Sequence, residues 1–166
     1  MHPRGLIVMR RAVGLLVIAA TSVALTACGG GDRLAHADFM REASHICRHG
    51  NARTSRVNVP PLTSDPAGAS RALTRIAMIG RATLADLRGL RPPKADGPAV
   101  DSWLAVIDQM LDETELARDA LRERQPIAAL EAIARATVLD GRARDLARQA
   151  GVHPCRLPPL LPTRST

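Results

Sequence analysis

Four stretches of this chain carry apolar residues at helical spacing, and breaks that contain proline separate them. The apolar residues recur at intervals of three and four, and no stretch shows the strict apolar–polar alternation of a strand. Aromatic residues, which favour strands, are limited to Phe39 and Trp103. Four helices with short connections favour antiparallel neighbours. The sequence therefore predicts an all-α fold, an up-down four-helix bundle.

Proline and glycine positions set the expected ends of these helices. The first helix is expected over residues 35–53, before the break around Pro60. The second begins at Asp65, a good N-cap, followed by Pro66, which suits the first helical position. Residues 91–97 hold two further prolines, so they are expected to end the second helix.

The third helix is expected over residues 98–124 and the fourth from Pro126 to Gly151, where glycine suits a left-handed C-terminal cap. Pro126 is compatible with a tight hairpin or with a kink in one continuous helix. We favour the hairpin, because one helix over residues 98–150 could not bury its apolar stripe in so short a chain.

Each expected helix has one apolar stripe that should pack in the core. The stripe residues are Phe39, Ala43, Ile46 and Cys47 in the first helix, Ala69, Leu73, Ile76, Gly80, Thr83, Leu87 and Leu90 in the second, Val100, Trp103, Leu104, Ile107, Leu111, Thr114 and Leu121 in the third, and Ile127, Leu130, Ile133, Thr137, Leu146 and Ala150 in the fourth. Because many core positions are alanine, the helices are expected to pack closely.

The chain begins with the three zones of a secretory signal. An arginine pair at residues 10–11 supplies positive charge, an uncharged apolar run covers residues 12–25, and two small residues follow. The run has 14 residues, which is short for a membrane span of about 20. The sequence predicts a signal peptide over residues 1–27, with translation starting at Met1 or at Met9.

Cys28 directly follows this segment. The sequence "LTAC" that ends at Cys28 resembles the lipobox of bacterial lipoproteins, in which the cysteine thiol receives a diacylglyceryl group and becomes the mature N-terminus. The organisation is similar to that of small lipoproteins of GC-rich bacteria, actinobacteria above all. Several acyl chains anchor a protein stably, whereas one binds only marginally. The resemblance implies a lipid on Cys28, a flexible tether over residues 28–34 and a place on the outer face of the cell membrane.

Cys47 and Cys155 are the two cysteines left after Cys28. An even number in an oxidising compartment predicts a disulfide between them. Closing a loop of about 100 residues in this way is worth up to about 4.7 kcal/mol. The bundle domain is expected over residues 35–155, and the proline-rich residues 156–166 are expected to form an irregular tail.

A metal site is the alternative use of these cysteines, since His45, His49 and His153 lie near them in the sequence. His45 and His49 are one helical turn apart and share a face. Cys47 lies on the apolar stripe, so we expect both histidines to face solvent. We therefore expect no metal and no cofactor, with a weak site at His45 and His49 as the alternative.

Charge is distributed unevenly along the chain. The formal net charge of +7 falls by the three signal arginines to +4, and neither a stacking platform nor a nucleic-acid-binding motif is present, which argues against nucleic acid. Residues 101–115 hold five acids and no base. The ordinary explanation of this acidic stretch is that its carboxylates pair with opposite charges on a neighbouring helix. The alternative is a functional surface patch that binds a basic partner, formed by Asp101, Asp108, Asp112 and Glu115.

Signatures of catalysis are missing from the sequence. It contains no nucleophile elbow, phosphate-binding glycine loop, zinc-protease motif or calcium loop. Carboxylates that share a helix face, such as Asp112 and Glu115, are usually solvated. The sequence thus predicts a non-catalytic interaction module whose partner is another envelope protein; the alternative is an envelope lipoprotein that binds a small ligand or a metal.

Overall fold

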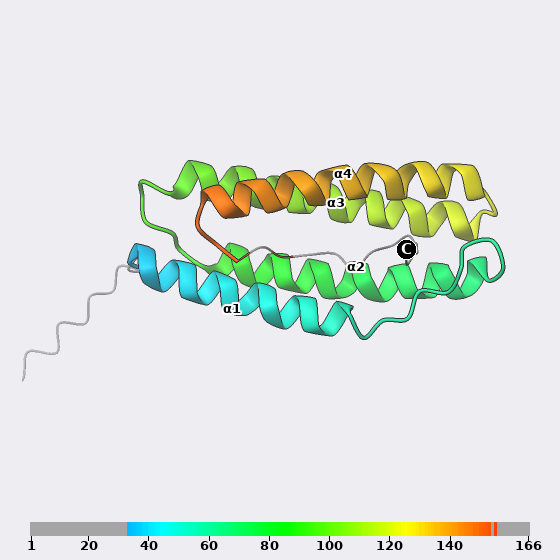
Figure 1. Cartoon of the computed structure of the whole chain (residues 1–166), viewed down its shortest axis with the longest axis horizontal. Helices are drawn as coiled ribbons and strands as arrows, with labels where there is room; N and C mark the ends of the chain where they lie inside the picture. The colour runs from blue at the N-terminus through cyan, green and yellow to red at the C-terminus, as the bar shows by residue number, and fades with distance from the viewer. Residues whose placement is uncertain (1–32, 154, 156–166) are drawn as a thin grey trace, which may run out of the picture. The chain divides into compact units, whose positions relative to one another are not determined.

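The computed structural model describes residues 33–153 and residue 155. In this part the chain forms four helices and no strand: α1 His36–Thr54, α2 Pro66–Gly89, α3 Gly97–Arg122 and α4 Pro126–Gln149 (Figure 1). Each helix runs antiparallel to the one before it, and the main contacts join α1 to α2, α2 to α3 and α3 to α4. The predicted all-α up-down bundle is confirmed. The predictions for Cys28, the signal segment and the tail lie outside the described residues.

Local interactions set the N-terminal end of α2 and the C-terminal end of α4 where the sequence predicts them. The Asp65 carboxylate accepts a hydrogen bond from the Gly68 N–H at 2.7 Å, and Pro66 is the first helical residue. Gly151 follows α4 with φ of +70°, and the next N–H, that of Val152, bonds back to the Ala147 carbonyl at 2.8 Å. These two ends are therefore set by a side-chain cap and a glycine turn.

The hairpin between α3 and α4 is also confirmed. Helix α3 ends at Arg122, and α4 begins at Pro126. Arg124 takes the left-handed conformation with φ of +59°, and the Gln125 N–H bonds back to the Ala120 carbonyl at 2.8 Å. The chain thus reverses within three residues, so α4 packs along α3 (Figure 1).

Two hydrophobic clusters fill the bundle. All four helices contribute to the first, whose largest side chains are Trp103 and Phe39. The second lies between α2, α3 and α4, and Val57, Val59 and Leu62 of the loop after α1 pack against it. Figure 1 shows that this loop continues past the end of α1 toward the start of α2. The loop therefore covers a part of the core that α1 does not reach.

The stripe predicted for α4 is partly wrong. Ile133 is buried, but Ile127 and Leu130 are 72% and 45% exposed, and Thr137 is exposed as well. The residues that α4 buries most are instead alanines: Ala129, Ala132, Ala136, Ala143 and Ala147. Small side chains let α4 approach α3 closely, and this packing decides which face turns inward. The stripes predicted for α1, α2 and α3 are buried or half-buried.

Candidate functional site

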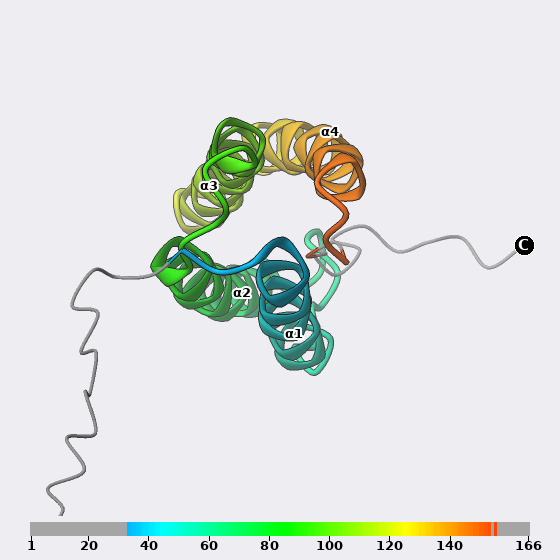
Figure 2. The same cartoon turned by 90° about the vertical axis from the view of Figure 1, so that its left-hand side faces the viewer.

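The Cys47–Cys155 disulfide is present in the structure, with the two Cα atoms 4.6 Å apart. Cys47 is fully buried on α1, and Cys155 belongs to the segment after α4. Val152 of that segment is buried, and the His153 N–H donates to Ser44 Oγ at 3.0 Å. Figure 2 shows this segment running from α4 toward α1, two helices that share no extensive contact of their own. The predicted disulfide therefore closes the side of the bundle between the first and last helices.

The histidines of α1 lie where the helical geometry predicts them. His45 and His49 are exposed, while Cys47 between them is buried and bonded to Cys155. Its sulfur is therefore not available as a metal ligand. Among the described residues, no group of three or more His, Cys, Asp or Glu side chains is placed to hold a metal ion.

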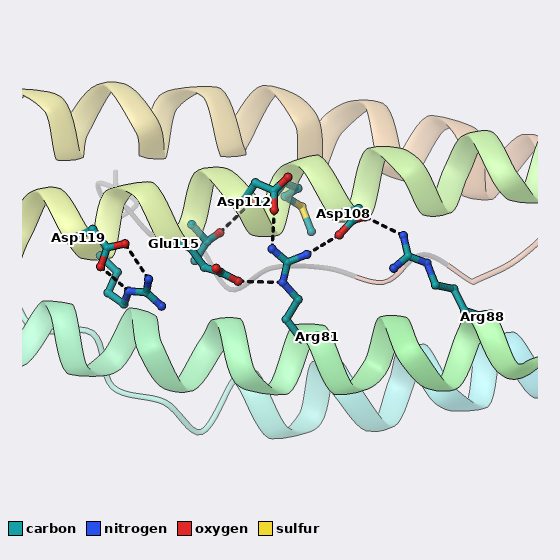
Figure 3. Close-up of polar contacts among 9 residues, drawn as sticks. Arg81, Arg88, Asp108, Asp112, Glu115 and Asp119 are labelled. Atoms are coloured by element: carbon teal, nitrogen blue, oxygen red, sulfur yellow. Dashed lines mark hydrogen bonds and ion pairs between the residues drawn. The ribbon is translucent and has the colours of Figure 1, made fainter.

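Three of the four carboxylates of the proposed acidic patch bind one arginine of the neighbouring helix. Arg81 of α2 donates to Asp108, to Asp112 and, at 2.8 Å from its Nε, to Glu115 (Figure 3). Arg88, two turns further along α2, donates to the second oxygen of Asp108 at 2.7 Å. The side chains of Arg81, Asp108 and Glu115 are each about one third exposed. The network thus lies at the rim of the α2–α3 interface.

The charges in this network stabilise one another. Burial lowers the pKa of Arg81, but the hydrogen bonds and charges of Asp112 and Glu115 outweigh it and raise that pKa above its ordinary value. The hydrogen bond from Arg88 lowers the pKa of Asp108, although partial burial opposes this effect. Arg81 and Asp108 are therefore both charged at neutral pH, and their attraction helps to hold α2 against α3.

The acidic stretch of α3 is accordingly an internal contact more than a free surface. Asp101 is exposed and stands outside the network, whereas Asp108, Asp112 and Glu115 face arginines of the same chain. Pairing of opposite charges on neighbouring helices, the ordinary explanation, is what the structure shows. Reversing these three charges would place arginines against Arg81, so such a variant could not test docking without disturbing the fold.

The outer face of α4 presents a surface that the sequence reasoning missed. Ile127, Leu130 and Val138 are 72%, 45% and 73% exposed, and Ala134 between them is exposed as well. At 3.6 residues per turn these four positions lie on one face of the helix. We call them the α4 stripe. The sequence indicated this surface only indirectly, because α4 has more apolar residues than one core-facing side of a helix can bury.

Comparison of the chain with protein-family models, curated proteins and solved structures finds no match. The described helices include none that is long and apolar enough to span a membrane.

Proposed function

We propose that the protein is a lipid-anchored envelope lipoprotein that acts as a non-catalytic interaction module. The exposed α4 stripe carries the interaction role, because an apolar surface along one helix face marks an interaction site. The lipobox resemblance at Cys28 supports the anchor. The bundle interior supports a small-ligand role poorly. The hollow between α1, α2 and α3, lined by Gly50, Gly80 and Ile107 among others, has a volume of only about 30 Å³.

A second copy of the chain is the partner that fits the α4 stripe. Leu130 and Val138 lie four residues before and after Ala134, and Ile127 and Gly141 lie seven before and after it. A two-fold axis at Ala134 would place two α4 helices antiparallel, so that positions equally far before and after Ala134 face each other across the axis. Leu130 then meets Val138, and Ile127 meets Gly141. The small Ala134 allows close approach at the crossing point.

Charges beside the α4 stripe agree with this arrangement. Helical geometry places Glu131, Arg135 and Arg142 on the same flank of the stripe. The two-fold axis places this flank of one copy next to the same flank of the other copy. Glu131 of each copy therefore lies near Arg135 and Arg142 of the other copy. Glu131 and Arg142 have no ion-pair partner among the described residues, whereas Arg135 also binds Glu113 at 2.9 Å. A dimer would pair charges that the single chain leaves unpaired.

Val138→Glu is expected to shift the protein from dimer to monomer. The new carboxylate would be buried beside Glu131 in the contact, and burying an unpaired charge is costly. Sedimentation equilibrium measures the change. Met78→Glu is the matched control, because Met78 is a similarly exposed apolar residue, 68% against 73%, but lies on α2.

A cysteine at the two-fold axis gives an independent measurement. In a Cys28→Ser background, Ala134→Cys should form an intermolecular disulfide rapidly, whereas Ala82→Cys, at an exposed alanine of α2, should not. A parent protein that stays monomeric as its concentration rises, or equal cross-linking of the two cysteine variants, would contradict self-association through α4.

The membrane anchor has a separate test. Cys28→Ala removes the thiol that the lipobox resemblance assigns to the lipid, so the domain should leave the membrane fraction or accumulate as an uncleaved precursor. Cell fractionation followed by intact-mass spectrometry measures both outcomes. If Cys28→Ala were processed and fractionated like the parent, the lipoprotein proposal would be wrong.

A further inference from the structure

A hollow lined by arginines lies where α2 begins and α3 ends. It has a volume of about 640 Å³, and its arginines are Arg71 of α2, Arg122 at the end of α3 and Arg124 of the turn before α4. The described residues that line it include no carboxylate. Arg122 forms an ion pair with Asp119, with 3.7 Å between Nη1 and Oδ1. Arg71 and Arg124 have no carboxylate partner in the described part of the chain. The hollow therefore holds an excess of positive charge.

A second hollow of about 350 Å³ adjoins the first and is mainly apolar. Pro66, Leu121 and Arg124 line both hollows, and Leu62 and Pro126 extend the second one away from the other arginines. This is the part of the bundle where the loop after α1 replaces α1 over the core. The chain thus places a cationic surface beside an apolar one, with three residues in common.

We propose that the two hollows together bind one amphiphilic anion, a molecule with a phosphate or carboxylate head and a hydrocarbon chain. Guanidinium groups pair with such oxyanions through parallel charge-assisted hydrogen bonds, and Arg71 and Arg124 are free to do so. The hydrocarbon chain gains by leaving water for the surface of Leu62, Leu121 and Pro126. Both volumes lie in the range of about 300–1,000 Å³ typical of small-molecule sites. The α4 stripe is not needed for this site.

Dodecyl phosphate, kept below its micelle concentration, is the probe for the experiment. Isothermal titration calorimetry on the full chain carrying Cys28→Ala, with the disulfide intact, should give saturable binding to one site. Arg71→Gln should weaken this binding about tenfold, the effect of losing one charge-assisted contact. Arg75→Gln, one turn further along α2, is the matched control, because Arg75 is exposed but does not line the hollow. Circular dichroism checks that both variants unfold like the parent.

Two further probes separate the head from the chain. Inorganic phosphate and the uncharged dodecyl maltoside should each bind more weakly than dodecyl phosphate, because each fills only one hollow. Equal weakening by Arg71→Gln and Arg75→Gln would overturn the proposal, since the arginines would then act as a diffuse basic surface. Binding to vesicles of anionic phospholipid without binding to dodecyl phosphate would overturn it too, because the apolar hollow would have no occupant.

Discussion

Cys47→Ala combined with Cys155→Ala is expected to lower the free energy of unfolding by up to about 4.7 kcal/mol. The two cysteines are 108 residues apart, so the bond removes much of the conformational freedom of the unfolded chain. The folded protein loses as well, because the segment that carries Cys155 closes the side of the bundle between α1 and α4. This loss is a large part of the stability of a domain of this size.

Urea unfolding followed by tryptophan fluorescence measures this loss. Trp103 is the only tryptophan and the chain has no tyrosine, and Trp103 lies in the same hydrophobic cluster as Cys47. The signal therefore reports the packing beside the disulfide. Reductant should bring the parent close to the double variant and should not affect the double variant. A change in unfolding free energy below about 1 kcal/mol would show that the bond contributes little.

Arg81→Ala is expected to lower the free energy of unfolding by about 1–2 kcal/mol, because it removes three hydrogen bonds to charged groups, each weakened by solvent at this partly exposed site. Three carboxylates of α3 lose their shared partner, and they then repel one another at the α2–α3 interface. Urea unfolding gives the difference. Arg75→Ala is the control on the same helix, because Arg75 is exposed, has no ion pair among the described residues and should change the stability by less than about 0.5 kcal/mol.

The effect of Arg81→Ala should depend on pH. Arg88 and, to a lesser degree, Arg81 lower the pKa of Asp108 in the folded protein below its unfolded value of about 3.9, so the ion pair between Arg81 and Asp108 stabilises the fold fully above that pH. This contribution is lost as the pH falls through the lowered pKa and Asp108 takes up a proton. The difference in stability between the parent and Arg81→Ala should therefore begin to shrink as the pH falls below about 3.9 and should be smallest below the lowered pKa of Asp108. A difference that stayed constant from neutral to acidic pH would show that packing of the Arg81 side chain, and not its charge, is responsible.

Local signals in the sequence were sufficient for most of the fold. Asp65 with Pro66, and Gly151, each have a backbone preference that acts within a few residues, so the corresponding helix ends could be predicted. The disulfide followed from the count of cysteines and from the position of Cys47 on the apolar stripe of α1. These features do not depend on which helix packs against which.

The surfaces of α3 and α4 depended on tertiary packing and could not be predicted in the same way. Helix α4 carries apolar residues on most of its faces, so their spacing alone could not predict whether Leu130 or Ala129 faces the core. The contact with α3 decided in favour of the alanine. Likewise the acidic stretch of α3 looked free until α2 was placed beside it in the register that brings Arg81 among its carboxylates. The sequence shows that this stretch is negatively charged, but only the packing of α2 against α3 shows which arginines bind its carboxylates.

The closing segment after α4 also sets an order of events in biosynthesis. Helix α1 is synthesised first, yet the residue bonded to it, Cys155, is made only after all four helices. A nascent chain in a reducing compartment can form the pairs α1–α2, α2–α3 and α3–α4 but cannot form the covalent bond between α1 and the segment after α4. The covalent closure of the domain is thus tied to an oxidising environment, so a chain retained in a reducing compartment would keep only non-covalent contacts between α1 and the segment after α4 and would be more accessible to proteases.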